Sequence, residues 1–260
     1  MRFLDAIAVV TGAGSGIGAS VAMRMAKEGA RVVLVGRTLA KLEHVAGAIE
    51  EECGRAAASV FAADVTQEDE IEGLAAFVQS EFGNVHILIN NAGGSGQSSP
   101  ILKTKTEDWD LVQSANLGSV FLVSKHIGKL MTEAAKAEPE AQLNRSIVNV
   151  ASLSGYKAGA QIPHYSAAKA GVINFSRALA FELAPYGIRV NSVSPGFVET
   201  PLTAEGLQNA RFEEAIQRKT ALRRIGKPEE IANVITFIAS PEASYMTGSD
   251  VLVDGGWLIV

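Results

Sequence analysis

The sequence predicts a doubly wound α/β domain built on one parallel sheet. Short runs rich in β-branched residues alternate along the chain with longer amphipathic stretches, the pattern of strands joined by helical crossovers. The 260 residues are 47% apolar, enough to bury a sizeable core, and no proline-rich, serine-rich or charged linker divides them. We therefore expect a single domain over residues 1–260.

The predicted elements follow from these runs in chain order. The strand candidates are residues 6–11, 31–35, 57–62, 86–90, 146–151, 189–194 and 249–253. The helix candidates are residues 17–28, 39–52, 68–82, 107–131, 167–184 and 228–239. Buried strands separated by helices imply crossover connections, and hence a parallel sheet with helices on both faces.

Composition narrows the classes of function. Lysine and arginine number 23 and aspartate and glutamate 28, a net charge of −5 that disfavours binding to nucleic acid or an anionic membrane. Cys53 is the sole cysteine, which excludes internal disulfides and multi-cysteine metal centres, and no metal site is expected. A strand starts within six residues of the N-terminus and no apolar run approaches about 18 residues. We expect a cytoplasmic protein without a signal peptide or membrane span.

A glycine-rich turn follows the first predicted strand. Residues 9–18 read VVTGAGSGIG, and an amphipathic helix begins inside this stretch. Glycines let backbone N–H groups approach a pyrophosphate closely, and the N-terminus of the helix adds a partial positive charge. The spacing is T-G-x-x-x-G-x-G rather than G-x-G-x-x-G. A tight connection without a ligand is the alternative, but four glycines in seven residues favour phosphate binding.

A second cluster of polar residues suits proton transfer. Tyr165 and Lys169 stand four residues apart after Pro163, so a helix starting there puts both side chains on one face. The lysine ammonium is expected to lower the phenol pKa from its usual value of about 10. Ser152, thirteen residues before the tyrosine, ends a strand-like run and could hold a substrate oxygen. Such a set suits carbonyl reduction or alcohol oxidation, although the Tyr-x-x-x-Lys spacing alone also recurs in ordinary amphipathic helices.

Further motifs join these two in a fixed order. They are Thr11–Gly18, Asp64-Val65, Asn90-Asn91-Ala92-Gly93, Asn116, Ser152, Tyr165-x-x-x-Lys169, Asn191, Pro195-Gly196 and Thr200. In this order and spacing, over nearly its whole length, the chain resembles the short-chain dehydrogenase/reductases. The resemblance implies a Rossmann-type sheet, a nicotinamide dinucleotide cofactor and a ketone or secondary-alcohol substrate.

The resemblance also implies catalytic roles. Tyr165 would be the acid in reduction and the base in oxidation, and Lys169 would lower its pKa and bind the nicotinamide ribose. Ser152 would orient the substrate oxygen. Asn116 would hold a water that links Lys169 to solvent; its alternative role is to satisfy backbone groups at a helix irregularity. His164 precedes Tyr165 and would point about 100° away from it, toward the pocket wall or the surface.

The implied cofactor contacts come from the ends of several strands. They are Gly12, Ser15, Gly16, Ile17, Gly18, Gly36, Arg37, Thr38, Asp64, Val65, Asn90, Ala92, Gly93, Tyr165, Lys169, Pro195, Gly196, Val198 and Thr200. In the family an acidic residue that repels a 2′-phosphate stands where this chain has Gly36, and Arg37 and Thr38 follow. We therefore expect NADP(H) to be preferred over NAD(H), which stays possible because Ser15 adds no second charge.

The substrate is expected to be a free, moderately apolar small molecule. The walls of the substrate pocket would come from residues 94–98, 154–156 and 161–164 and from a lid at about 197–219. A 3-oxoacyl-acyl-carrier-protein reductase is the first alternative, but residues 138–143 and 183–187, where such enzymes carry docking bases, contain no basic residue. A non-catalytic, dinucleotide-sensing interaction protein is the second; the complete set of catalytic residues argues against it.

The C-terminal run predicts assembly. Residues 248–260 suggest an edge strand followed by an apolar tail, and residues 107–131 and 167–184 carry more apolar side chains than one buried stripe requires. Members of the family commonly use these elements as two-fold interfaces. We expect a homotetramer, with a dimer as the second possibility and a tail folded onto its own subunit as the alternative.

Overall fold

The computed structural model describes residues 1–138, 144–159 and 161–260 of the chain. At its centre lies one sheet of seven parallel strands in the order β3-β2-β1-β4-β5-β6-β7. The strands are β1 (Ile7–Thr11), β2 (Arg31–Gly36), β3 (Ala58–Ala62), β4 (Ile87–Asn90), β5 (Arg145–Val150), β6 (Ile188–Pro195) and β7 (Asp250–Val253). The predicted doubly wound parallel sheet in a single domain is confirmed.

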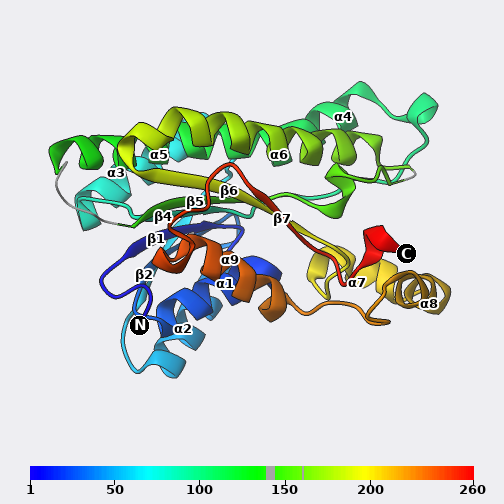
Figure 1. Cartoon of the computed structure of the whole chain (residues 1–260), viewed down its shortest axis with the longest axis horizontal. Helices are drawn as coiled ribbons and strands as arrows, with labels where there is room; N and C mark the ends of the chain where they lie inside the picture. Colours follow the sequence, from blue (N-terminus) through cyan, green and yellow to red (C-terminus); the bar gives the residue numbers. More distant parts are fainter. Residues whose placement is uncertain (139–143, 160) are drawn as a thin grey trace.

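Helices cover both faces of the sheet. They are α1 (Gly16–Lys27), α2 (Leu39–Cys53), α3 (Glu68–Phe82), α4 (Thr106–Gln113), α5 (Ser119–Ala137), α6 (Pro163–Leu183), α7 (Pro201–Leu207), α8 (Ala210–Lys219) and α9 (Pro228–Ala239). Figure 1 shows α3, α5 and α6 on one face and α1, α2 and α9 on the other. This three-layer arrangement buries both faces of every central strand, which is why the strands read as continuous apolar runs.

Alternate residues of the central strands pack into two separate hydrophobic cores, one on each face of the sheet. Val10 and Leu34 pack with α1, α2 and α9, whereas Val9 and Val33 pack with α3, α5 and α6. All four side chains are fully buried. A buried aliphatic side chain of this size contributes about 1.5–3 kcal/mol relative to an exposed one. The packed layers hold the ends of the strands in place, and the loops that follow these ends carry the candidate functional residues.

One predicted helix is divided in the structure. Residues 107–131 were expected to form one helix, but α4 and α5 are separated by a π-helical segment, Ser114–Gly118. A π turn admits one extra residue per turn and is common at functional sites. Apolar periodicity continues through the segment, so the sequence pattern alone reads as one helix.

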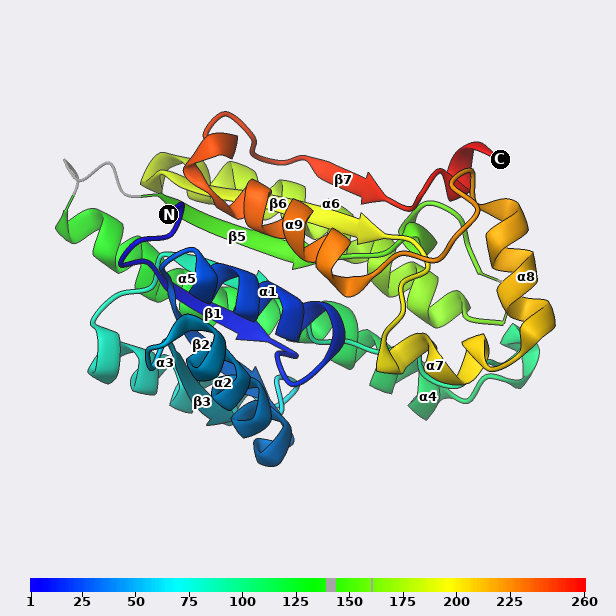
Figure 2. The same cartoon turned by 90° about the horizontal axis from the view of Figure 1, so that it is seen from below.

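The C-terminal elements gather at one end of the sheet. β7 is the edge strand, as predicted, and the chain ends in a short 3₁₀ turn, η6 (Trp257–Ile259). Figures 1 and 2 both show this end of the chain beside α8. The segment expected as a lid at about 197–219, for which no helix was predicted, contains the helices α7 and α8. Within the described residues, no helix is both long and apolar enough to cross a membrane.

Candidate functional site

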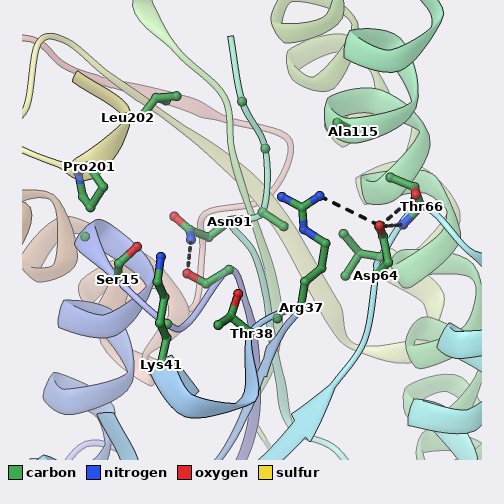
Figure 3. A pocket seen from close by; sticks show the side chains of 18 of the residues that line it. Ser15, Arg37, Thr38, Lys41, Asp64, Thr66, Asn91, Ala115, Pro201 and Leu202 are labelled. Carbon is green, nitrogen blue, oxygen red and sulfur yellow. Dashed lines mark hydrogen bonds and ion pairs between the residues drawn. The ribbon is translucent and has the colours of Figure 1, made fainter. Parts of the chain in front are cut away.

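A cavity of about 470 Å³ opens at the carboxyl ends of the strands. It lies where the strand order reverses, with β1 between β2 and β4, which is the usual ligand crevice of a doubly wound sheet. Its walls come from the loops after β1, β2, β3 and β4, from α4, and from the start of α7 (Figure 3). The loops after the four strands and Thr200 were expected from the sequence to bind a dinucleotide, Pro201 and Leu202 to form part of a substrate lid, and α4 was not predicted for the site.

The glycine-rich turn forms the floor of the cavity. Gly12 and Gly16 adopt φ angles of 64° and 55°, in the left-handed region that favours glycine. A Cβ on Gly18 would lie 2.3 Å from the carbonyl oxygen of Gly12, so only glycine lets α1 start this close to the turn. Because α1 begins at Gly16, its free N–H groups face the cavity and provide an anion-binding end.

Two cations line the cavity, Arg37 beside Asp64 and Lys41 beside Ser15 of the glycine-rich turn. Arg37 follows β2, and Lys41 lies in the first turn of α2 (Figure 3). The Arg37 side chain is 79% exposed, and its Nη1 lies 4.0 Å from the carboxylate of Asp64. That carboxylate also accepts hydrogen bonds from the backbone N–H and the hydroxyl of Thr66. Arg37 is therefore held at the rim by a weak ion pair and stays open to an anionic ligand.

Ser152, Tyr165 and Lys169 lie together beside the cavity, outside its lining. Ser152 follows β5, and its hydroxyl accepts a hydrogen bond of 3.1 Å from the backbone of Ser154. Tyr165 and Lys169 lie on the first turns of α6, with the lysine Nζ 5.6 Å from the centre of the tyrosine ring. The helix begins at Pro163, where the proline predicted an entry, and so starts four residues before the candidate range 167–184.

Gly93 joins the catalytic group to the cavity. It lines the cavity after β4, and a Cβ there would lie 2.6 Å from Asn116 Oδ1 and 3.5 Å from Lys169 Nζ. Asn116, inside the π segment, is fully buried and donates 2.8 Å hydrogen bonds to the carbonyl oxygens of Gly94 and Val112. The amide thus fixes the cavity wall and satisfies the helix irregularity.

The environment shifts the pKa values of Tyr165 and Lys169. Burial raises the pKa of Tyr165, and hydrogen bonding to Ser152 acts in the opposite direction. Burial lowers the pKa of Lys169 to about 8. Lys169 is not among the groups that shift the pKa of Tyr165, although the sequence predicted that it would lower this pKa. Its Nζ donates a 2.8 Å hydrogen bond to the carbonyl oxygen of Val150.

Comparison with known proteins agrees with this geometry. The family model described as enoyl-(acyl carrier protein) reductase matches residues 12–258. The 3-oxoacyl-[acyl-carrier-protein] reductase FabG of Thermotoga maritima is 38% identical over 259 residues, 100% of both chains. The cyclohexanol dehydrogenase of Acinetobacter sp. (strain SE19) is 38% identical over 257 residues, 98% of this chain and 96% of that one. The crystal structure of levodione reductase superposes with a TM-score of 0.92 at 34% identity, covering 98% of each chain.

The chain belongs to the short-chain dehydrogenase/reductase family. As a member of it, the protein is an oxidoreductase of the class that uses NAD(H) or NADP(H). The left-handed glycines, the exposed helix N-terminus and the cavity volume fit such a dinucleotide.

Most of the predicted cofactor residues of this short-chain dehydrogenase/reductase line the cavity. They are Gly12, Ser15, Gly16, Ile17, Gly36, Arg37, Thr38, Asp64, Val65, Ala92, Gly93 and Thr200. Gly18, Tyr165, Lys169, Pro195, Gly196 and Val198 lie outside its lining. Asn90 differs from the expectation: its side chain is buried and donates to Ser124 and Asn149, and the neighbouring Asn91 lines the cavity instead.

Several lining residues were not predicted from the sequence. They are Lys41, Leu42, Ala63, Thr66, Leu111, Val112 and Ala115. Gly94, Gly96, Pro201 and Leu202, expected in the substrate walls, also line the cavity, as do Gly14 and Asn91 of the quoted motifs. Lys41 had a readable signal, because it lies four residues after Arg37 in the first turn of a helix, where side chains point back toward the N-terminal end. Leu111 and Val112 had no readable signal in the sequence, because their position in the cavity depends on the π-helical segment.

Two expected substrate-wall residues have other partners. The Tyr156 hydroxyl donates a 2.6 Å hydrogen bond to Asp250 on β7, which together with burial raises the pKa of this phenol to about 12. His164 was expected at the pocket wall or the surface; it is fully buried, with its ring against Gly96 of the cavity lining. Of the stretches examined for carrier docking, residues 139–143 lie outside the described residues.

Proposed function

We propose that this chain is an NADP(H)-dependent oxidoreductase that interconverts a small apolar ketone and the corresponding secondary alcohol. One observation carries the proposal: the Ser152, Tyr165 and Lys169 group borders a glycine-floored cavity through the Gly93 wall. A binding protein has no need of a phenol and an ammonium on one helix face beside a serine hydroxyl. The alternative of a non-catalytic dinucleotide sensor is therefore disfavoured.

The residues divide the chemistry between them. Bound NADPH supplies the hydride. Tyr165 donates its phenolic proton to the substrate oxygen in reduction and accepts it back in oxidation. Ser152 orients that oxygen. Lys169, whose Nζ is bonded to the carbonyl oxygen of Val150 and lies 5.6 Å from the centre of the Tyr165 ring, would bind the nicotinamide ribose. Asn116 supports the proton path by fixing the wall next to Nζ.

The preference for NADP(H) rests on charge. Arg37 and Lys41 give the adenosine end of the cavity two cations where a 2′-phosphate would lie, and Gly36 replaces the carboxylate that would repel it. Asp64 offsets part of this charge through its 4.0 Å pair with Arg37. From the sequence, the expected preference for NADP(H) depended on Arg37 as the one cation, and Lys41 now adds a second. We expect NAD(H) to bind more weakly than NADP(H).

The substrate class rests on the apolar mouth of the cavity. Leu111 of α4 and Leu202 of α7 both line it and are 63% and 55% exposed. Such side chains favour an apolar ligand over a phosphorylated or carboxylated one. The named activities of the cyclohexanol dehydrogenase and levodione reductase relatives are consistent with an alicyclic alcohol or ketone.

A 3-oxoacyl-acyl-carrier-protein reductase is the second candidate. The FabG relative at 38% identity favours it. The charges at the expected docking stretches argue against it. Residues 183–187 carry no basic side chain to attract an acidic carrier, and Glu138 places a negative charge in the other stretch, residues 138–143. The free small molecule therefore remains our proposal.

We also propose a homotetramer in the cytoplasm, with a dimer as the second possibility. Phe121 on α5 and Phe181 on α6 are 47% and 85% exposed, and Ile259 and Val260 leave the tail apolar and accessible. Large exposed aromatic side chains on adjacent helices are typical of surfaces that a neighbouring subunit covers.

A cofactor-oxidation screen tests the proposal. NADPH and NADH are each supplied with cyclic ketones, linear ketones, and 3-ketoacyl thioesters of coenzyme A and of acyl carrier protein. We expect turnover with NADPH and a cyclic or branched ketone. A carrier-bound thioester outpacing every free ketone by more than about 100-fold in kcat/KM would establish the carrier-protein reductase instead. Dinucleotide binding without turnover on any carbonyl would establish a sensor.

A further inference from the structure

Three segments far apart in sequence interlock beside α7 and α8. They are residues 196–200, which leave β6; residues 220–226, which follow α8; and residues 253–257, which follow β7. Together they surround a small cavity of about 100 Å³. The helices α7 and α8, here called the lid, are attached to the domain through the first two segments (Figure 2).

The third segment fits against the first two by backbone contact. Gly196 packs so closely that a Cβ on it would lie 2.7 Å from the Cα of Asp254. Gly255 and Gly256 have φ angles of 62° and 83°, and Cβ atoms there would lie 2.8 Å and 2.7 Å from side-chain carbons of Thr220 and Ala221. The tail is therefore shaped to pass against both ends of the lid.

An aromatic cluster sits on this junction. The ring of Trp257 lies 4.8 Å from that of Phe197, at the start of the lid segment, with an interplanar angle of 58°. Phe197 in turn meets Phe212 of α8 edge-on, at 6.0 Å and 82°. Lys219, the last residue of α8, places its Nζ 5.9 Å from the centre of the Trp257 ring. The indole thus touches both the entry and the exit of the lid.

The orientation of the tail is itself fixed. The Asp254 carboxylate accepts hydrogen bonds of 2.8 Å and 2.9 Å from the backbone N–H groups of Gly256 and Leu258. The 3₁₀ turn that carries Trp257 is therefore capped by a charged acceptor, and its side chain is half-buried against the lid. A loosely attached tail would not need such a cap.

From these contacts we infer that Trp257 is a positioning residue that holds the lid at the apolar mouth of the cavity, where Leu202 lies. Thr200, Pro201 and Leu202 line the cavity directly after the segment that contains Phe197. A shift of Phe197 would therefore move the apolar wall that selects the substrate. The inference rests on the proposed function in one respect, that the lid closes over a carbonyl substrate.

Hydrogen exchange of the purified protein tests the positioning without any substrate. We expect Trp257→Ala to accelerate exchange of the amides in residues 197–219 by about tenfold, the scale of one lost aromatic pair, and to leave the central strands unchanged. Trp257→Phe should recover most of the protection because it restores a ring against Phe197. Unchanged lid exchange in Trp257→Ala overturns the inference.

Matched variants separate positioning from general destabilisation. Tyr245→Ala removes an aromatic side chain that is fully exposed, and it should exchange like the wild type. If Trp257→Ala does not fold, Phe212→Leu removes the other ring that meets Phe197 and should loosen the same amides. Acceleration spread evenly over the strands and the lid would show a structural role only, and would also count against the inference.

Kinetics supply the functional readout. With a ketone accepted by the wild type, Trp257→Ala should raise KM for the ketone about tenfold while kcat stays within about threefold. A tenfold fall in kcat at an unchanged KM for the ketone contradicts the inference. If the wild type turns over no carbonyl, the proposed function fails, and the exchange experiment still decides whether Trp257 positions the lid.

Discussion

The side-chain nitrogen of Lys169 donates a 2.8 Å hydrogen bond to the carbonyl oxygen of Val150, the last residue of β5. This bond joins the catalytic helix α6 to the central sheet and sets the ammonium at the base of the site. The side chain is only 4% exposed, and burial lowers the pKa of this lysine from 10.5 to about 8.

The lowered pKa of Lys169 predicts a pH-dependent cost to stability. Between pH 8 and 10.5 the unfolded chain holds a proton on this lysine that the folded chain releases. The free energy of unfolding therefore rises with pH across this window, by at most about 3 kcal/mol, and the penalty is constant below it. Denaturant unfolding of the wild type and of Lys169→Met at several pH values measures the difference, which should grow toward high pH. A difference that is flat from pH 7 to 11 contradicts the lowered pKa.

Tyr165→Phe tests the acid/base assignment. The substitution removes the transferable proton and keeps the ring, so the fold and the NADP dissociation constant should be preserved while kcat falls at least about 1000-fold. Steady-state kinetics and a fluorescence titration with NADPH give both quantities. Turnover within about tenfold of the wild type would exclude Tyr165 as the acid/base.

Arg37 and Lys41 are expected to share recognition of the 2′-phosphate. Lys41→Ala should weaken NADP binding about tenfold, since it removes one of the two cations from this end of the cavity. The NAD dissociation constant is the internal control and should not change. The pair Gly36→Asp and Arg37→Ala should shift preference toward NAD. A wild type that already uses NAD as efficiently as NADP refutes this reading of the charges.

Gly18 and Gly47 form a matched pair of helical glycines. A Cβ on Gly18 would lie 2.3 Å from the carbonyl oxygen of Gly12, whereas one on Gly47 in α2 would meet nothing within 4 Å. Gly18→Ala should reduce the free energy of unfolding by about 1–3 kcal/mol and weaken dinucleotide binding, because the phosphate turn must move. Gly47→Ala should stabilise the chain by about 0.5–1 kcal/mol. Thermal melts with and without NADP measure both effects, and equal melting temperatures for the two variants would contradict the role of Gly18.

The exposed aromatic residues of α5 and α6 predict assembly. Light scattering behind a sizing column should show a particle of about four 27.3 kDa chains, or of two, at micromolar concentration. Phe181→Glu should reduce the mass if the 85% exposed ring is covered by a neighbouring subunit. A wild-type protein that elutes as a single chain would contradict the proposed assembly. The alternative, a tail that folds onto its own subunit, would then remain.

The sequence by itself determined the strands and most of the helices. Each predicted strand agrees with the structure to within one residue at either end, and the helices at 68–82 and 228–239 agree fully. Buried strands and amphipathic helices impose apolar periodicities that can be read locally. The same holds for the glycine turn and for the Tyr165 and Lys169 pair, because each depends on spacing within one element.

Tertiary structure decided where those motifs meet and what each side chain touches. The break of the helix at Ser114–Gly118, the entry of Lys41 into the cavity and the turning of Asn90 toward Ser124 all depend on neighbours distant in sequence. The raised pKa of Tyr165 also depends on the fold, because burial is set by packing rather than by the helix that carries the residue. Contacts across the sheet and between its loops leave no local period in the chain, so only the folded arrangement determines them.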